Sequence, residues 1–446
     1  MTRAFQTRLL VAALGFVLLS PSPAPAQFLP DGAYTVTPFT PTGQDGTLAL
    51  SVMNNTTGQT LVAVGVGGMT YGPAQAAIAR YFPNESLDPS FGAGGVSLGG
   101  PTSARGEALT LQPDNKPVVA GWNLLGAQNN NLLVLRYTTG GQLDTSFNGT
   151  GWVSYDVAGA NGNDQAWGVV VQSTGKIVVA GDTYSASTGL SSFVVTRFQA
   201  NGALDTGSTG FGQKDSNGNR LGYRITTPVR GSSNVCTGLA LQGDGKLVAV
   251  GEAQLNSGGP AVVVRYTAEG DLDTTFGTGG IVTNSLGGFQ ILPQAVTLDA
   301  AGNILLAGSW RSSAPQAPWQ FMVARFLPTG ALDTTFNHQG FVTFAVNGAG
   351  NTRAYASAVQ SDGKILATCV LGNPNAGPSF AVVRLNVDGT LDRNFGNGGV
   401  KVLSLAGASR VVPSSLAILS NGAIYVGGLC WDSNNREYPL LAQFLP

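Results

Sequence analysis

The sequence predicts an all-β protein, a seven-bladed β-propeller whose blades each contain four antiparallel strands. Three observations lead to this prediction. A Leu-Asp motif such as LDTTF recurs six times, at Leu87, Leu143, Leu204, Leu272, Leu332 and Leu391. An apolar run such as VVVRY precedes each motif, and seven apolar hairpins such as LALQGDGKLVAVG recur along the chain. The repeats show no helical period, so short strands joined by turns are expected.

Each repeat offers four strands, which we name a to d. In the second repeat they are EALTLQ, KPVVAG, NLLVLRY and GWVSYDV. Asp-Gly or a related pair at the a–b turn supplies the positive φ of a tight hairpin. Strands a and b are apolar throughout, as expected where neighbouring sheets cover both faces. The predicted units are 31–91, 95–147, 151–206, 210–276, 280–336, 340–395 and 399–446. A linear β-solenoid is the alternative, although its repeats are usually shorter.

The two ends of the chain complement each other. The last unit stops after strand c and lacks a strand d, whereas the segment GAYTVTPF near the N-terminus is a spare strand. We expect these two to pair and close the ring, because closure leaves no open sheet edge. The sequence QFLP occurs at both Gln27 and Gln443. Either the two copies mark the same position of the repeat, at which the ring is opened into two chain ends, or they match by chance.

The first 26 residues have the pattern of a secretory signal peptide. Arg3 and Arg8 precede an apolar run, and Ala24-Pro25-Ala26 forms a cleavage site before Gln27. A buried N-terminal helix is the alternative. We expect a secreted protein, extracellular or periplasmic, with no membrane span and a monomeric state.

Composition narrows the partners. Charged residues make up 11% of the chain and the formal net charge is −1, so nothing favours nucleic acid or an anionic membrane as partner. The three cysteines, Cys236, Cys369 and Cys430, are too few for a disulfide framework and are expected to be buried. A single Cys369–Cys430 bridge is the alternative.

An arginine lies eight residues before the aspartate of each Leu-Asp motif. The six pairs are Arg80 and Asp88, Arg136 and Asp144, Arg197 and Asp205, Arg265 and Asp273, Arg325 and Asp333, and Arg384 and Asp392. The seventh unit has Gln443 in the arginine position and no aspartate. Because both residues occur or are missing together, we expect structural ion pairs between strand c and the c–d connection. A ring of six functional sites is the alternative. We expect Phe91, Phe147, Phe276, Phe336 and Phe395 to pack between blades at the same connection.

The order DGK, VVAG, VVVRY and GDLDTTFGTGG resembles the delta-60 repeat of exported bacterial proteins. The resemblance covers nearly all of residues 31–446. It implies the repeat and export, and it brings no activity or catalytic residues. Unit three departs from it with LDTGSTGFG and a polar insertion, and unit one has NTTGQT in place of the Asp-Gly turn.

Propellers usually bind ligands on the face that carries the d–a and b–c connections, which here differ in every unit. Candidate ligand-binding residues at this mouth are Arg105, Glu107, Asp164, Gln165, Asn234, Gln294, Arg353 and Arg410. They either hold a polar or acidic ligand or pair with one another. Trp122, Trp310 and Trp431 follow strand b and either stack on a partner or pack beneath the loops. We expect Trp319, Tyr71 and Tyr184 to be more exposed.

The sequence offers little for catalysis, and we predict no catalytic residue. The single histidine, His338, lies in a c–d connection, which excludes multi-histidine metal centres and Ser-His-Asp hydrolysis. Asp215, Asn217 and Asn219 alternate as in calcium loops, but Thr226 stands where a bidentate carboxylate is needed, so a polar insertion is favoured and no cofactor is expected.

These observations predict an exported binding or scaffold protein that recognises an extracellular glycan or protein through the variable face. A polysaccharide hydrolase or lyase that depends on Glu107 and Asp164 is the main alternative. A structural component of the cell envelope is a third possibility.

Overall fold

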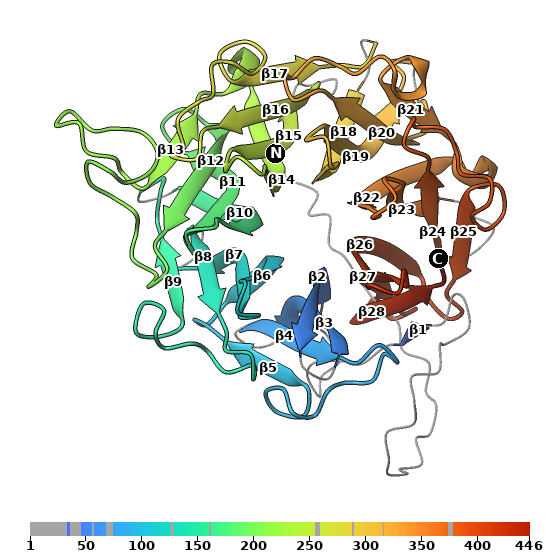
Figure 1. Ribbon diagram of the computed structural model, residues 1–446, viewed down its shortest axis with the longest axis horizontal. Coiled ribbons are helices and arrows are strands. Elements are labelled where there is room, and N and C mark those ends of the chain that lie inside the picture. The colour runs from blue at the N-terminus through green and yellow to red at the C-terminus, as the bar shows by residue number, and fades with distance from the viewer. Residues whose placement is uncertain are drawn as a thin grey trace.

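In the computed structural model, seven antiparallel sheets surround a central axis (Figure 1). The structure describes residues 34–35, 46–55, 58–67, 75–125, 129–159, 162–254, 259–287, 290–314, 316–372 and 378–446. The predicted signal peptide and Tyr71 lie outside these ranges. Within them, no helix is long and apolar enough to cross a membrane.

Six blades are formed by four consecutive strands, with strand a nearest the axis. Blade 1 contains β2 Gly46–Asn55, β3 Gly58–Gly67, β4 Gln75–Tyr81 and β5 Val96–Gly99. Blade 2 contains β6 Ala104–Leu111, β7 Pro117–Leu124, β8 Asn130–Arg136 and β9 Trp152–Tyr155. Blade 3 contains β10 Asn163–Val171, β11 Ile177–Ser185, β12 Leu190–Phe198 and β13 Tyr223–Thr226.

The next three blades follow the same plan. Blade 4 contains β14 Ser233–Leu241, β15 Leu247–Gln254, β16 Ala261–Tyr266 and β17 Ile281–Asn284. Blade 5 contains β18 Gln290–Leu298, β19 Ile304–Arg311, β20 Gln320–Phe326 and β21 Phe341–Phe344. Blade 6 contains β22 Asn351–Val359, β23 Ile365–Gly372, β24 Ser379–Leu385 and β25 Val400–Ser404. Short 3₁₀ turns occur at η1 Val229–Gly231, η2 Phe336–His338 and η3 Val346–Gly348.

The seventh sheet corrects the predicted fold. It combines β26 Arg410–Ile418, β27 Ile424–Trp431 and β28 Glu437–Phe444 with β1, which is only Tyr34–Thr35 in the described residues. The prediction of a seven-bladed propeller is therefore wrong, because six complete blades are followed by a sheet whose outer strand has two described residues. The predicted pairing of the N-terminal strand with the last strand is confirmed, since Tyr34 and Thr35 pair with Ala442 and Leu441. Each of the six complete blades has an Arg–Asp pair at the c–d connection before its outer strand, and the described residues of the seventh sheet contain no such pair.

The core consists of apolar layers between neighbouring sheets. One buried cluster lies at each of the seven contacts between adjacent sheets, including the contact between the seventh sheet and blade 1. Between blades 2 and 3, for example, Val118, Phe147 and Val179 are completely buried. Strands a to c are apolar on both sides because each sheet is covered on both faces.

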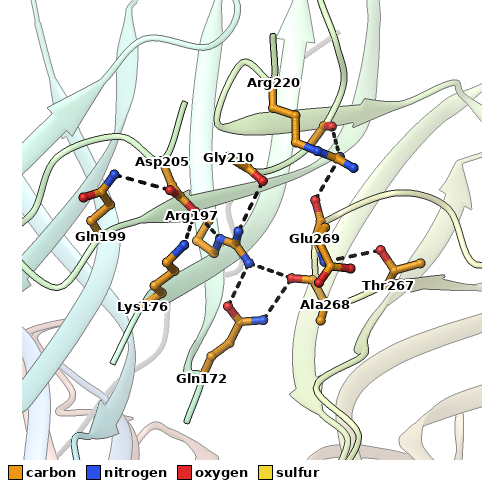
Figure 2. Close-up of polar contacts among 11 residues, drawn as sticks. Gln172, Lys176, Arg197, Gln199, Asp205, Gly210, Arg220, Thr267, Ala268 and Glu269 are labelled. Atoms are coloured by element: carbon orange, nitrogen blue, oxygen red, sulfur yellow. Dashed lines mark hydrogen bonds and ion pairs between the residues drawn. The ribbon is translucent and has the colours of Figure 1, made fainter. Parts of the chain in front are cut away.

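The six predicted Arg–Asp pairs are present, and they link blades as well as strands. In each, the arginine Nε lies 2.6 to 2.9 Å from the aspartate Oδ2. The Nη1 of Arg136 also donates to the carbonyl of Ala200 in blade 3 at 2.5 Å. Figure 2 shows the equivalent arrangement around Arg197, which bonds to Asp205 and to the carbonyl of Ala268 in blade 4.

The five phenylalanines expected to pack between blades are buried, and a phenylalanine ring lies against each of the six guanidinium groups. The Cζ atom of the arginine is 4.3 to 4.9 Å from the ring centroid in all six blades. In unit three, where the motif departs from the pattern, the ring is that of Phe211. The sequence contained the signal for it, since Phe211 follows the irregular LDTGSTG segment.

At the contact between the seventh sheet and blade 1, a different residue forms the hydrogen bond that links one sheet to a carbonyl of the next. Gln443 occupies the arginine position, and Tyr425 lies opposite it in the ladder, where the other blades have valine or leucine. The Tyr425 hydroxyl donates to the carbonyl of Pro83, the counterpart of the Ala200 and Ala268 carbonyls. Tyr425 therefore replaces the missing arginine.

Glu85 belongs to the same contact. The other blades have glycine with positive φ at this position, as at Gly141, where an added Cβ would meet the Phe91 ring at 3.0 Å. Glu85 carries a side chain at this position, and it is buried with φ of 64°. Burial raises its pKa to about 8.

Cys236, Cys369 and Cys430 are free and buried, so the alternative Cys369–Cys430 bridge is not formed. Burial raises the pKa of the Cys236 thiol to about 12. The three side chains pack in the core, as the sequence predicted for small buried residues.

Candidate functional site

The candidate site lies on the mouth face, which we define as the face formed by the d–a and b–c connections. The Arg–Asp pairs lie among the a–b turns and c–d connections of the opposite face, which we call the turn face. Strand a of every blade runs from the mouth face along the axis (Figure 1). Side chains near the start of these strands therefore meet around the axis.

Two of the predicted mouth residues hold their own loops. Asp164 is fully buried, and its Oδ2 accepts backbone N–H bonds from Val157 at 2.6 Å and Ala158 at 3.1 Å. Asn234, at the same place in blade 4, accepts a bond from the Val229 amide at 2.6 Å. Burial raises the pKa of Asp164 despite these bonds. Both side chains order the d–a connection and do not face the channel.

Glu107 lies in blade 2 in a compact polar group. Its Oε1 is 2.6 Å from the Nε of Arg105 and accepts a bond from the Trp122 indole at 3.3 Å. Trp122 is half-buried, so its ring packs in this group. The two carboxylates of the enzyme hypothesis thus have different surroundings, since Glu107 is paired with a cation and Asp164 is bound by backbone amides.

Blade 3 holds a group of the same chemistry, which the sequence did not reveal. The Trp167 indole donates to Asp182 Oδ1 at 2.8 Å, with tryptophan on strand a and the acid on strand b. In blade 2 the acid is on strand a and the tryptophan on strand b. The predicted Gln165 is buried in β10 opposite Asp182.

Blades 5 and 6 and the seventh sheet form what we call the arginine–tryptophan cluster: Arg311, Trp319, Arg353, Arg410 and Trp431. The Cζ atoms of Arg311 and Arg353 lie 4.7 and 5.3 Å from the Trp319 ring centroid, and that of Arg410 lies 3.8 Å from the Trp431 ring. Trp319 and Trp431 are buried beneath them, with 7% and 6% of their surface exposed. The expectation that Trp319 is exposed is wrong, because the two arginines cover it.

The cluster keeps three positive charges close together. Among the described residues, no carboxylate forms an ion pair with Arg311, Arg353 or Arg410. Arg311 donates to Gln290 Oε1 at 2.6 Å. Burial, with the neighbouring charge of Arg353, lowers the pKa of Arg410, although Tyr355 and Glu437 act in the opposite direction. The Trp319 backbone is fixed by the Asn351 and Thr352 contacts at 3.0 and 2.9 Å, which tie blade 5 to blade 6.

The remaining candidates take other places. Gln294 faces a cavity on the axis, whereas Trp310 and Tyr184 are half-buried near the ends of their strands. In the polar insertion of unit three, Asp215 Oδ1 accepts the amides of Asn217 and Asn219 at 2.9 and 2.8 Å. Sequence reasoning missed Arg311, Trp167, Asp182 and Tyr355. Only Arg311 had a signal, since it directly follows Trp310.

The cavity on the axis is lined by strand a of all seven sheets and has a volume of about 240 Å³. Each of these strands shifts its register with strand b once, by a β-bulge. The bulge positions that line the cavity, which we call the neck, are Glu107, Trp167, Thr237, Gln294, Tyr355 and Ser414. Small residues such as Gly168 and Gly238 accompany them, because adjacent blades approach closely there.

The chain matches a family model over four segments, residues 112–147, 172–207, 242–276 and 360–395. The family is described as Domain of unknown function (DUF5122) beta-propeller. Each matched segment contains one Arg–Asp pair and runs from the a–b turn to the c–d connection. The match therefore describes the scaffold of the turn face and leaves out the channel-lining strands.

Solved structures resemble the chain only at low sequence identity. A protein of unknown function from Dyadobacter fermentans has a TM-score of 0.41 at 10% identity, covering 93% of this chain and 99% of that chain. A polysaccharide lyase, PL25-Ulvanlyase, has a TM-score of 0.48 at 12% identity, covering 90% of this chain and 94% of that chain. Sqt1 from Chaetomium thermophilum has a TM-score of 0.45 at 11% identity, covering 90% of this chain and 96% of that chain. No curated protein matches the chain significantly. These likenesses do not distinguish an enzyme from a binding protein.

Proposed function

We propose that this protein is a non-enzymatic binding propeller that recognises an acidic extracellular glycan through its mouth face. The observation that carries the proposal is the arginine–tryptophan cluster, where three guanidinium groups lie together. A guanidinium stacked on an indole is held in one plane, so its N–H edge is available for bidentate bonds to a carboxylate or sulfate.

One acid of the mouth face, Glu437 of the seventh sheet, interacts with Arg410, whereas three others lie away from the cluster. Glu107 is paired with Arg105, Asp182 accepts the Trp167 indole, and Asp164 accepts backbone amides. Each is committed within its own blade, on the side of the ring away from the cluster. A polyanion therefore meets a net positive charge over blades 5 and 6 and the seventh sheet, where Arg311 and Arg353 add to an Arg410 that Glu437 partly offsets.

A glycan fits this surface better than a protein does. Protein interfaces are usually anchored by exposed aromatic side chains that insert into a partner. Here Trp319 and Trp431 are buried under arginines, so the cluster presents charged planar edges. The proposal thus refines the glycan-or-protein expectation, and a protein partner becomes one outcome of the test.

Binding of the purified protein to polygalacturonate and dextran sulfate, with neutral dextran as reference, tests the proposal. Arg353→Ala with Arg410→Ala should weaken binding to the polyanions at least about tenfold and reduce its salt dependence. Arg393→Ala with Lys214→Ala is the matched control, since both side chains are exposed on the turn face and together carry the same charge. Equal binding by the cluster variant and the control would refute the assignment.

The same wells should be read for product. Chain cleavage that disappears in Glu107→Gln would favour the lyase or hydrolase alternative. Absence of binding to every polysaccharide would favour a protein partner or a structural role in the envelope.

Export is part of the proposal and rests on the pattern of residues 1–26 and on the delta-60 resemblance. Mass spectrometry of protein recovered from the periplasm or medium should find Gln27 as the first residue. An intact leader on protein confined to the cytoplasm would contradict export.

A further inference from the structure

The contact between the seventh sheet and blade 1, which we call the closure contact, differs in charge from the other contacts of the ring. In five of those, an arginine donates to a carbonyl of the next blade and brings a positive charge. In the closure contact Gln443 stands in the arginine position, so that charge is missing. Glu85, buried in place of a glycine, adds a carboxyl group. The described residues of this contact therefore contain an acid where the others contain a base.

The side chains of the closure contact meet around the Tyr425 hydroxyl. Gln443 lies directly opposite Tyr425 in the ladder, so both side chains leave the seventh sheet on the face toward blade 1. Tyr425 donates to the Pro83 carbonyl, two residues before Glu85 in the chain. Burial and the charge of Glu85 raise the pKa of Tyr425, which places the carboxyl group near this hydroxyl.

The other blades show where the Glu85 side chain points. At the glycines that occupy its position, an added Cβ would meet the phenylalanine ring that stacks on the arginine; they are Gly141, Gly202, Gly270, Gly330 and Gly389. Those rings lie 4.3 to 4.9 Å from the arginine Cζ atoms. The Glu85 side chain therefore extends toward the arginine position, where Gln443 stands.

Two buried oxygen atoms of the closure contact have no hydrogen-bond donor among the described residues. They are Oε1 of Glu85 and Oε1 of Gln443, whose residues are 4% and 2% exposed. Within the same part of the chain, no basic side chain forms an ion pair with Glu85, and burial alone accounts for its raised pKa. Tyr425 cannot serve as the donor, because its one O–H is already bonded to Pro83. Buried oxygens of this kind need a positive partner.

We propose that the closure contact binds one monovalent metal cation, Na⁺ or K⁺, between Oε1 of Glu85 and Oε1 of Gln443. The ion supplies the charge of the missing guanidinium group, while Tyr425 supplies its bond to the carbonyl. Carboxylate and amide oxygens are the ligands that hard cations prefer. A single carboxylate balances a single positive charge, and the described residues contain no group of three Asp, Glu, His or Cys side chains that could hold a metal ion by themselves. The bound ion joins the last sheet of the chain to the first.

A proton is the competing occupant, because a neutral Glu85 carboxyl group can donate to Gln443. The two are separated at pH 9, where a carboxyl group with a pKa of about 8 is ionised and needs another partner. The closure contact lies on the turn face and shares no residue with the arginine–tryptophan cluster. The proposal therefore stands or falls independently of the proposed function.

Urea unfolding of the whole protein at pH 9, in chlorides of tetramethylammonium, Na⁺ and K⁺ at equal ionic strength, tests the proposal. Tetramethylammonium is too large for a buried site and reports screening alone. Na⁺ or K⁺ should raise the urea midpoint progressively with concentration, because a ligand of the folded state stabilises it by mass action. Glu85→Gln should abolish this difference between salts. Glu252→Gln, the matched control, should keep it, since Glu252 is a half-buried glutamate of blade 4 whose pKa is also raised by burial.

Two variants of Gln443 test the second ligand. Gln443→Leu should weaken the apparent affinity for the ion about tenfold, because a buried oxygen ligand is lost. Gln443→Arg returns the guanidinium group, so it should raise the midpoint in tetramethylammonium chloride and remove any further response to Na⁺ or K⁺. Sodium NMR line widths, broadened by the wild-type protein and not by Glu85→Gln, detect the ion without relying on stability.

Equal midpoints of the wild-type protein in all three salts would overturn the proposal. An equal response of Glu85→Gln and the wild type would do the same, because the ion would then bind elsewhere. A response to calcium chloride alone would replace the monovalent ion by a divalent one and refute the assignment.

Discussion

The six Arg–Asp pairs differ in one respect that predicts unequal stability effects. In blades 2, 3, 4 and 6 a lysine of the a–b turn also contacts the aspartate, as Lys246 does with Asp273 at 3.3 Å. In blade 5, Asn303 occupies the lysine position and bonds instead to Asp299. Among the described residues, Asp333 therefore has Arg325 as its single cationic partner, at 2.7 Å.

Arg325→Ala removes that ion pair, a bond to the Val387 carbonyl at 2.6 Å and the contact with the Phe336 ring. Leaving a buried carboxylate without its partner costs ~3–5 kcal/mol of unfolding free energy. Arg265→Ala leaves Lys246 beside Asp273, so the expected loss is the ~1–3 kcal/mol of an unsatisfied Pro328 carbonyl.

Urea unfolding at neutral pH, followed by tryptophan fluorescence, measures both losses, with Arg393→Ala as the exposed control. Adding Asn303→Lys to Arg325→Ala should recover part of the stability, because it supplies the lysine that four other blades use. The reasoning is refuted if Arg325→Ala falls within ~0.5 kcal/mol of the control. It is also refuted if the two buried arginines give equal losses.

Three further predictions concern ionisation and metal. Glu85→Gln should raise the unfolding free energy by ~1–3 kcal/mol near pH 9 and change it little near pH 4. The pKa of Glu85 is about 8 in the folded protein against an ordinary value of 4.5, so wild-type stability falls as the pH rises from 4.5 to 8. Unfolding curves of variant and wild type that coincide at both pH values would contradict this prediction. Burial alone would raise the pKa values of Asp144 and Asp273, but hydrogen bonds from Ser146 and Thr275, with lysine and arginine nearby, hold both at about 2. The stability that these two carboxylates contribute should therefore be fully present above about pH 4 and be lost as the pH falls toward 2. Unfolding measured across an acid titration would show this loss. Calcium should leave the melting temperature unchanged, since Asp215 already accepts two amides of its own turn; a calcium-dependent rise would restore the calcium-loop hypothesis.

Much of the fold could be predicted because its determinants are local and repeated. Leu-Asp motifs, tight-turn glycines and apolar hairpins each specify one strand or turn, and they recur with the same spacing. The pairing of Arg265 with Asp273 was predictable for the same reason, since both were always present or absent together. The blade-bridging bonds to carbonyls such as Ala200 were not, because backbone acceptors leave no trace in a side-chain pattern.

The candidate site was predicted less well. Arg353, Arg410 and Glu107 were chosen by their position at the start of strand a, and the structure brings the two arginines together. Asp164 and Trp319 were misjudged, because their exposure depends on a loop and on two arginines from different blades. The neck could not be foreseen, since a β-bulge is a property of the register between two strands.

By itself the sequence determined the repeat, the strands and the partners on the turn face, because those interactions lie within one blade and are repeated. Tertiary structure alone decided which side chains complete the closed ring, where Tyr425 takes over the arginine's bond to a carbonyl and Glu85 stands in the glycine position. It also decided which charges gather on the mouth face. Both depend on residues far apart in the chain, which only closure of the ring brings into contact.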